Sequence, residues 1–353
     1  MSKRTRIDVA LYRQVGRLMD GFQVGDAEKW VEEKMRADTG TVTKDALKEK
    51  SMHFNSIDIE NVCIIRYMNE TNPIEDQSFI LSLIEHLYDE CYRLKLRPSI
   101  MMTNRNNIDK VLSEVVNGDA DGIIIVGMEV PEERIDVIKS FNFHGIPTVL
   151  LGYGMEGTNI SCVNLANEQE SYMAVEYLYQ CGYREIGYLH SSEDQWGFHQ
   201  RAIGFEQALR DFQICCPLKL EVVSTISSAY EEIKAWLKKN QPVPRAFFAD
   251  NDNTALGAMK AFSEVGYRIP EDIALVGMDD IVYSAFSDCP LTTIHISRGQ
   301  LAHEAVRSLL FFDEKSGVAR IYCRGRLVIR SSTRRFDASR EEAMILKKVD
   351  RGV

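Results

Sequence analysis

The chain has 353 residues, a formal net charge of −10 and 45% hydrophobic residues, a length that suggests two or three domains. No run approaches the roughly 18 apolar residues of a membrane helix, and the N-terminus has no apolar signal region, so we expect a cytoplasmic protein without a membrane segment. The eight scattered cysteines favour reduced thiols over a disulfide framework. The acidic balance argues against a protein that coats nucleic acid over its whole surface.

The first 60 residues differ from the rest because they are charged, rich in predicted helix and free of buried-strand patterns. Residues 1–50 hold eleven Lys and Arg against nine Asp and Glu, so this segment is slightly basic within an acidic chain. The stretch Thr39–Leu47, preceded by Leu11–Val15 and Gly25-Asp26, resembles the recognition-helix region of a GntR-type winged helix. The resemblance implies DNA contacts, to phosphates and a few base edges, from Thr39, Thr41, Thr43, Lys44 and Lys48.

Two interpretations of this head stay open. The spacing between Gly25-Asp26 and Thr41-Val42 is short for a winged helix, and no Gly-rich wing follows in residues 51–60. Placing Val15–Gly21 on a LacI-type helix-turn-helix instead leaves too short a turn. The head is therefore either a divergent DNA-binding domain or a helical cap that no longer binds DNA.

From Val62 onward, short apolar runs alternate with helical patterns. The expected strands are 62–65, 99–102, 122–126, 148–151, 162–163, 186–190, 220–223, 246–249 and 273–277. The expected helices include 78–96, 108–116, 132–141, 168–180, 201–211 and 228–239. This alternation predicts an α/β fold of parallel sheets with helices on both faces.

Polar clusters follow two of the predicted buried strands. Asp250-Asn251-Asp252 come after the strand at 246–249, and Asp279-Asp280 come after the strand at 273–277. Ligands of open parallel sheets sit beyond the carboxyl ends of the strands, so both clusters point at one crevice. We interpret Asp252 and Asp280 as caps at helix starts.

The stretch Ala246–Thr293 resembles the effector-binding domain of LacI/GalR-type transcription regulators. The matching residues are Asn251-Asp252, Ala255-Leu256-Gly257, Gly266, Pro270-Glu271-Asp272, Val276-Gly277, Asp279-Asp280 and Pro290-Leu291-Thr292-Thr293. The resemblance implies a two-lobed, periplasmic-binding-protein-like sensor whose chain crosses between the lobes three times. Mapping the pattern places the crossings near Ile160-Ser161, near Thr292–Ile294 and near Cys323-Arg324.

This map divides the chain into three regions. Residues 1–60 form the head, and residues 61–336 form the sensor. Lobe one is expected at about 61–160 and 294–323, and lobe two at about 161–293 and 324–336. A charged tail occupies residues 337–353.

The family pattern also implies a ligand cleft. It carries the clamping arginine onto Arg201, the amide onto Asn251 and the hydroxyl-accepting carboxylate onto Asp279, a set suited to sugar hydroxyls. Lobe one would add Asn72, in the turn Asn69–Pro73. The aromatic candidates for a stacking wall are Phe79, Trp196 and Phe198, with a structural role as the alternative for the two before Arg201. Ile74-Glu75-Asp76 replaces the usual aromatic pair, which leaves the ligand's identity open.

Other functions find little support. Gly152-Tyr153-Gly154-Met155-Glu156-Gly157 satisfies G-x-G-x-x-G, but a β-like stretch follows it where a dinucleotide site needs a helix. No hydrolase, zinc-protease or P-loop motif appears, and the seven histidines lack metal-ligand spacing, so we expect no enzyme, cofactor or metal.

We therefore expect a homodimeric, ligand-responsive transcription regulator of the repressor type. It would bind operator DNA through its head and a small carbohydrate-like effector in its cleft. The alternative is a small-molecule-binding sensor protein without DNA binding.

Overall fold

The computed structural model describes residues 59–68, 77–154, 158, 160–311 and 318–335. The chain divides into two compact units, residues 1–55 and 56–353. The predicted DNA contacts Thr39, Thr41, Thr43, Lys44 and Lys48 lie outside the described residues, as do Asn72 and the tail at 337–353.

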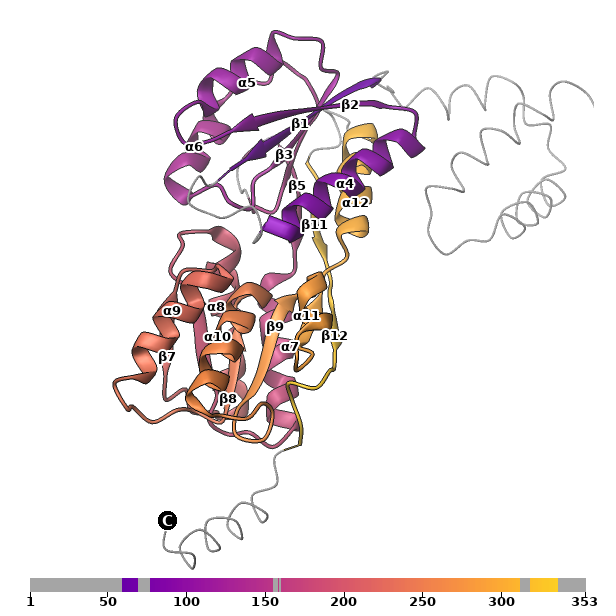
Figure 1. Ribbon diagram of the computed structural model, residues 1–353. Helices are drawn as coiled ribbons and strands as arrows, with labels where there is room; N and C mark the ends of the chain where they lie inside the picture. The colour runs from indigo at the N-terminus through magenta and orange to yellow at the C-terminus, as the bar shows by residue number, and fades with distance from the viewer. Residues whose placement is uncertain (1–58, 69–76, 155–157, 159, 312–317, 336–353) are drawn as a thin grey trace, which may run out of the picture. The chain divides into compact units, whose positions relative to one another are not determined.

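Two lobes, each built on its own sheet, make up the described part of the chain (Figure 1). The first sheet has the order β11-β5-β4-β3-β1-β2, and its paired strands are parallel. Its strands are β1 (Asn61–Tyr67), β2 (Arg97–Thr103), β3 (Gly122–Val126), β4 (Thr148–Leu151), β5 (Ser161–Leu165) and β11 (Arg320–Cys323). Its helices are α4 (Ser78–Arg93), α5 (Ile108–Val116), α6 (Glu132–Ser140) and α12 (Arg298–Leu310).

The second sheet has the order β12-β10-β9-β8-β6-β7, and within it β12 runs antiparallel to β10. Its strands are β6 (Gly187–Ser191), β7 (Lys219–Val222), β8 (Ala246–Ala249), β9 (Ala274–Asp279), β10 (Thr292–His295) and β12 (Arg326–Val328). The helices of this lobe are α7 (Asn167–Gln180), α8 (Trp196–Phe212), α9 (Ile226–Leu237), α10 (Asp252–Val265) and α11 (Val282–Phe286). The predicted α/β class is confirmed.

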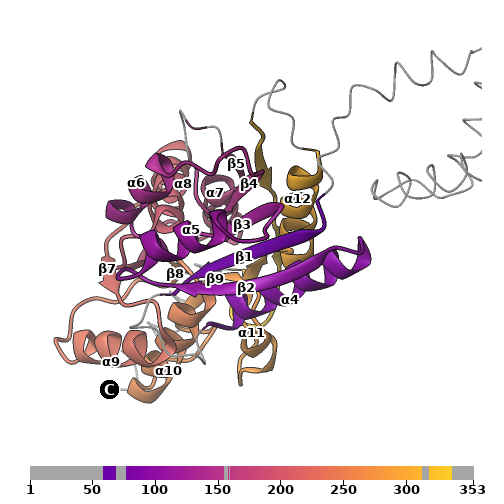
Figure 2. The same ribbon diagram turned by 90° about the horizontal axis from the view of Figure 1, so that it is seen from above.

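The period-2 alternation of the central strands explains the layering. In β3, Ile124 belongs to the core under α4 and α12, whereas Ile123 and Ile125 belong to the core under α5 and α6. The core under α4 and α12 continues into lobe two beneath α7 and α8, where it includes Phe248. Helices α4 and α12 lie side by side (Figures 1 and 2).

The crossings between the lobes are displaced from the sequence map. We expected the first near Ile160-Ser161, but β5 pairs with β4 and β11 and extends the first sheet to Leu165. The second was expected by Ile294, but β10 belongs to the second sheet through His295. The sequence map gave β5 to lobe two and divided β10 between the lobes, because apolar runs do not indicate which neighbour a strand pairs with. The third crossing lies between Cys323 and Arg326.

Helix α8 begins at Trp196, whereas the sequence predicted a start at Arg201. Its N-cap residue Gln195 is extended and forms an antiparallel bridge with Pro131 of lobe one. Trp196 and Phe198 therefore lie in the first helical turn and not in a loop. The G-x-G-x-x-G stretch is followed, within the described residues, by strand β5 and not by a helix, as predicted.

Helices α7 and α8 are in close contact at a glycine. A Cβ built on Gly204 would lie 2.0 Å from the Glu168 carbonyl oxygen and 2.3 Å from Ser171 Oγ. Because the first contact is with backbone, the helices must separate to admit a methyl group. Gly197, on the same helix, is different, since its Cβ would come no closer than 3.6 Å to Asn167 Nδ2.

We predict that Gly204→Ala lowers the free energy of unfolding by about 1–3 kcal/mol, the usual cost of overpacking. Gly197→Ala serves as the matched control and should be neutral or slightly stabilising, because alanine is the better helix former. Urea unfolding of both variants measures the difference. Equal stabilities would contradict the close helix contact.

Candidate functional site

A cleft between the two lobes collects polar side chains from the carboxyl ends of both sheets. Lobe one contributes residues around the start of α4 and the end of β3, and lobe two contributes residues from α8, β9 and the starts of α9 and α10. The lining residues are Gln77, Phe79, Ile80, Met128, Glu129, Gly152, Leu165, Asn167, Gln195, Gly197, Phe198, Arg201, Ser224, Thr225, Asn251, Asn253, Asp279 and Ile281.

Arg201 is buried in the wall of this cleft, and its guanidinium bonds to three elements of lobe two. Its Nε donates to Asn167 Oδ1 at 2.9 Å, and its Nη1 donates to the backbone carbonyl of Asp250. Its Nη2 lies 3.4 Å from Asp279 Oδ1. The ring of Phe198 lies 5.3 Å from the guanidinium carbon. A buried cation is tolerated only when it is paired and hydrogen-bonded, so these partners fix Arg201 in place.

Asp279 ends β9 with a left-handed backbone, φ 115°, which is uncommon for a residue with a side chain. Burial raises the pKa of Asp279, and the nearby Arg201 and Arg298 counteract that rise. Apart from the long contact with Arg201, no described residue donates a hydrogen bond to this carboxylate. Asp279 therefore keeps capacity to accept hydrogen bonds from a ligand.

Asn251 has two roles at the start of α10. Its Oδ1 accepts from the Thr254 amide at 2.9 Å, so it is the N-cap of the helix. Its Nδ2 makes a long contact, 3.4 Å, with the Ser224 carbonyl and lies on the cleft. Thr225 caps α9 in the same way, accepting from Ser228 at 3.1 Å.

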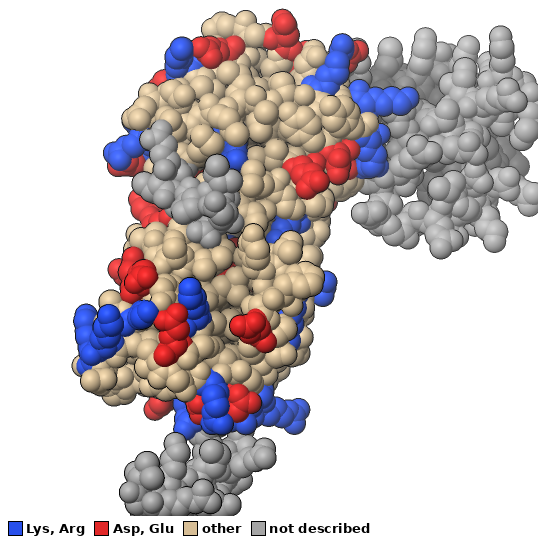
Figure 3. All heavy atoms as spheres, in the orientation of Figure 1, with Lys and Arg blue, Asp and Glu red and all other residues tan. Residues whose placement is uncertain are grey.

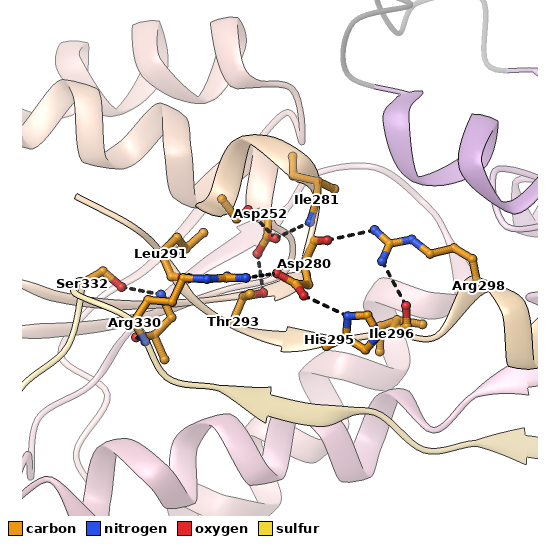
Figure 4. A network of polar contacts seen from close by, with 12 residues as sticks. Asp252, Asp280, Ile281, Leu291, Thr293, His295, Ile296, Arg298, Arg330 and Ser332 are labelled. Atoms are coloured by element: carbon orange, nitrogen blue, oxygen red, sulfur yellow. Dashed lines mark hydrogen bonds and ion pairs between the residues drawn. The ribbon is translucent and has the colours of Figure 1, made fainter. Parts of the chain in front are cut away.

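Asp252 is completely buried and joins α10 to the loop after β9 (Figure 4). Its Oδ2 accepts from the Ile281 amide at 3.0 Å and from Ser284 Oγ at 2.6 Å, and its Oδ1 accepts from Thr293 Oγ1 at 2.6 Å. Burial and the neighbouring Asp279 raise its pKa to about 7, although these hydrogen bonds oppose the shift. Its role is to hold the loop that presents Asp279.

Asp280 has different partners from Asp252 and pairs with two basic side chains (Figure 4). Its Oδ1 lies 2.5 Å from Arg330 Nη2, and its Oδ2 lies 2.8 Å from His295 Nδ1. Burial tends to raise its pKa, but the hydrogen bonds from Arg330 and His295 outweigh it and lower the pKa. The prediction that Asp252 and Asp280 cap helices was wrong, because Asn251 caps α10 and α11 has no side-chain cap.

The three aromatic candidates take different places. Phe79 and Phe198 both line the cleft, and the guanidinium of Arg298 stacks 4.8 Å from the Phe79 ring. Trp196 does not line it. Its ring packs 5.7 Å from that of Tyr153 in lobe one, and Gly154 leaves the space it fills.

The structure thus brings together Arg201, Asn251, Asp279, Phe79 and Phe198. Sequence reasoning missed several polar residues of the same wall, including Gln77, Glu129, Gln195, Ser224 and Asn253. The rule that ligands meet the ends of parallel strands would have found Ser224, which follows β7. Nothing in the sequence pattern indicated Gln77 or Gln195, because both lie just before helices without a side-chain cap.

The surface offers few other indications of chemistry. Acidic and basic side chains are interspersed on the face shown in Figure 3, without a large field of one sign. Among the described residues, no group of three or more His, Cys, Asp or Glu side chains is placed to hold a metal ion. No described helix is long and apolar enough to cross a membrane.

Two similar α/β lobes joined by three crossings, with a polar cleft between them, define a two-lobed small-molecule-binding protein. Residues 175–333 match the family described as periplasmic binding protein-like domain. The chain is 31% identical over 236 residues to the HTH-type transcriptional repressor PurR of Haemophilus influenzae (strain PittEE), an alignment covering 65% of this chain and 68% of that protein. It is 31% identical over 265 residues to PurR of Pasteurella multocida (strain Pm70), covering 72% and 78%.

Solved structures agree on the fold. A dimeric Lac repressor with an 11-residue C-terminal deletion matches with a TM-score of 0.69 at 22% identity, covering 78% of this chain and all of that one. The transcriptional regulator CelR–cellobiose complex matches with a TM-score of 0.67 at 19% identity, covering 84% and 92%. The chain belongs to the LacI/GalR family of transcription regulators.

Asp252 and Asp280 should give opposite pH dependences of stability. The folded-state pKa of Asp252 is raised, so its protonation favours the folded state at low pH, and that contribution is lost as pH rises from about 4 to about 7. Asp252→Asn should therefore be more stable than the parent at pH 8, by at most about 4 kcal/mol, with the difference shrinking toward pH 4.

The control is Asp280→Asn, whose parent carboxyl has a lowered pKa. Its ion pairs stabilise the folded state above the ordinary pKa and are lost as pH falls through the folded pKa. This variant should be less stable than the parent at pH 8, with the difference vanishing in acid. Urea titrations between about pH 2 and pH 8 measure both, with the Asp280 change expected below about pH 4 and the Asp252 change above it. Parallel profiles for the two variants would refute the assigned environments.

Proposed function

We propose that this chain is a transcription repressor that senses a small carbohydrate-like effector in the inter-lobe cleft and binds operator DNA through residues 1–60. The observation that carries the proposal is the convergence of Arg201, Asn251 and Asp279 on a cleft lined by both lobes, in a member of the LacI/GalR family. No metal or cofactor is needed for this activity.

The chemistry of the cleft supports a neutral, hydroxyl-rich effector. The positive charge of Arg201 is already offset by Asp279. This arginine is therefore not available to neutralise an anionic ligand. Amides such as Asn167 and Asn251 and the hydroxyls of Ser224 and Thr225 can donate and accept, as sugar hydroxyls require. Phe79 adds an apolar face. The fold relative CelR was solved with cellobiose, which agrees with this class.

The architecture supports a closure mechanism. A ligand that touches Gln77 and Phe79 of lobe one and Asn251 and Asp279 of lobe two favours one relative position of the lobes. The ligand can shift the equilibrium between the two lobe positions by no more than the difference in its binding free energy for them. In a dimer, closure would change the separation of two heads on a pseudo-palindromic operator.

An exposed apolar surface supports the dimer. Helix α11 presents Val282, Tyr283 and Phe286 to solvent, and Phe286 is 83% exposed. Clustered exposed apolar side chains of this kind commonly mark protein interfaces. The sensor protein without DNA binding is the less favoured alternative, because the relatives with 31% identity are HTH-type transcriptional repressors.

Replacing Asp279 tests the effector site. We predict that Asp279→Asn weakens effector affinity about 10- to 100-fold, the range for a lost hydrogen bond to a charged group, and leaves effector-free operator binding intact. Calorimetry with a sugar selected by thermal-shift screening, and gel shifts on the chain's own promoter region, measure the two properties. Glu231→Gln, an exposed change on α9, is the control. An unchanged effector affinity would remove Asp279 from the site.

Replacing Lys44 tests the head. We predict that Lys44→Ala lowers operator affinity and reduces by about one the slope of log K against log salt concentration, because one phosphate contact is lost. Lys238→Ala, at the end of α9, should leave that slope unchanged. A slope unaltered by Lys44→Ala would argue against this lysine, and absence of any operator binding would favour the sensor alternative.

A further inference from the structure

A second hollow lies beside the crossings between the lobes and is not used by the proposed effector site. Its walls include Glu168 and Gln169 at the start of α7, Trp196 and Gln200 on α8, and Tyr322 and Arg324 at the third crossing. The hollow therefore contacts helices α7 and α8 of lobe two and strand β11 of lobe one.

The first turns of α8 separate this hollow from the effector cleft. Trp196 and Gln200 are four residues apart and share one face of the helix, which lines the second hollow. Phe198 and Arg201 face the effector cleft instead. Two distinct recesses are thus built on opposite faces of one helix.

Strand β5, whose Leu165 lines this hollow, also carries a buried amide. Asn164 of β5 is fully buried, and among the described residues neither its Oδ1 nor its Nδ2 has a hydrogen-bond partner. Asn164 pairs in register with Tyr322 of β11, so both side chains leave the same face of the first sheet. Buried side-chain amides are nearly always satisfied. Of this register pair only Tyr322 lines the hollow, so Tyr322 is the residue that a ligand there would contact.

We propose that this hollow is a second, accessory site for a small uncharged polyol of monosaccharide size. Two aromatic side chains, Trp196 and Tyr322, offer apolar faces to a sugar ring, and Gln169 and Gln200 offer amides that both donate and accept. The one cation, Arg324, is already bonded through Nε to Glu170 Oε1 at 2.7 Å. Glu168 adds another carboxylate, so the charge balance disfavours an anion.

The position of the site couples it to the effector cleft. Asn167 and Leu165 line both recesses, and the Asn167 side chain accepts from Arg201 Nε at 2.9 Å. A ligand that shifts Asn167 changes the support of Arg201, and the coupling must be reciprocal. This consequence rests on the proposed function of the cleft, whereas binding in the second hollow does not.

The test uses the full chain labelled with 5-fluorotryptophan, because the chain has three tryptophans, Trp30, Trp196 and Trp236. The Asp279→Asn background weakens the effector cleft, and the probes are D-glucose, D-galactose, D-mannose, D-ribose and L-arabinose. We expect at least one sugar to shift the Trp196 fluorine resonance saturably, with Trp236 unmoved. Adding Tyr322→Ala should weaken that binding about tenfold or more, and adding Tyr283→Ala should not.

A second variant keeps the proposal testable if Tyr322→Ala perturbs the strand. Gln200→Leu, on α8 and not on the strand, removes one of the two lining amides, so it should also weaken the saturable shift about tenfold or more. A Trp196 resonance that no probe shifts saturably would overturn the accessory site. A shift that survives both Tyr322→Ala and Gln200→Leu would overturn it as well. Neither outcome alters the effector test on Asp279, so the two proposals fail separately.

Discussion

The buried guanidinium of Arg201 is the interaction on which the cleft depends. It is bonded at once to the start of α7, the end of β8 and the end of β9, so one side chain sets the spacing of three elements that line the ligand wall. Removing one partner of a buried charge usually costs several kcal/mol, because the other charge is left unpaired. The same bonds offset the positive charge, which makes the cleft suited to neutral hydroxyl groups.

Three neighbouring carboxylates, Asp252, Asp279 and Asp280, have different roles around Arg201. Asp252 is buried among hydroxyl and amide donors and holds the loop after β9, whereas Asp280 ties that loop to β10 and to Arg330. Asp279, adjacent to Asp280 in sequence, is left with an open acceptor capacity. Two structural acids thus fix the backbone that directs the third acid into the cleft.

The sequence alone was sufficient to predict those parts of the fold and the site that local residue patterns determine. Buried apolar runs and polar strand ends predicted the two-sheet α/β fold and placed Asn251 and Asp279 at one crevice. Long-range pairing decided the rest. Whether β5 and β10 belong to the first or the second sheet depends on which strand edge they meet, and their residues do not encode that choice locally. Likewise, Asp252 looks like a helix cap until its partners 29 to 41 residues away are known.

The most direct test of the central claim is a crystal structure of the chain with an effector found by thermal-shift screening of sugars. The account predicts electron density for the sugar between the lobes, with a hydroxyl within hydrogen-bond distance of Asp279 and another near Asn251, and with Arg201 still bonded to Asn167. A sugar bound elsewhere, with this cleft empty and Asp279 unengaged, would contradict the account.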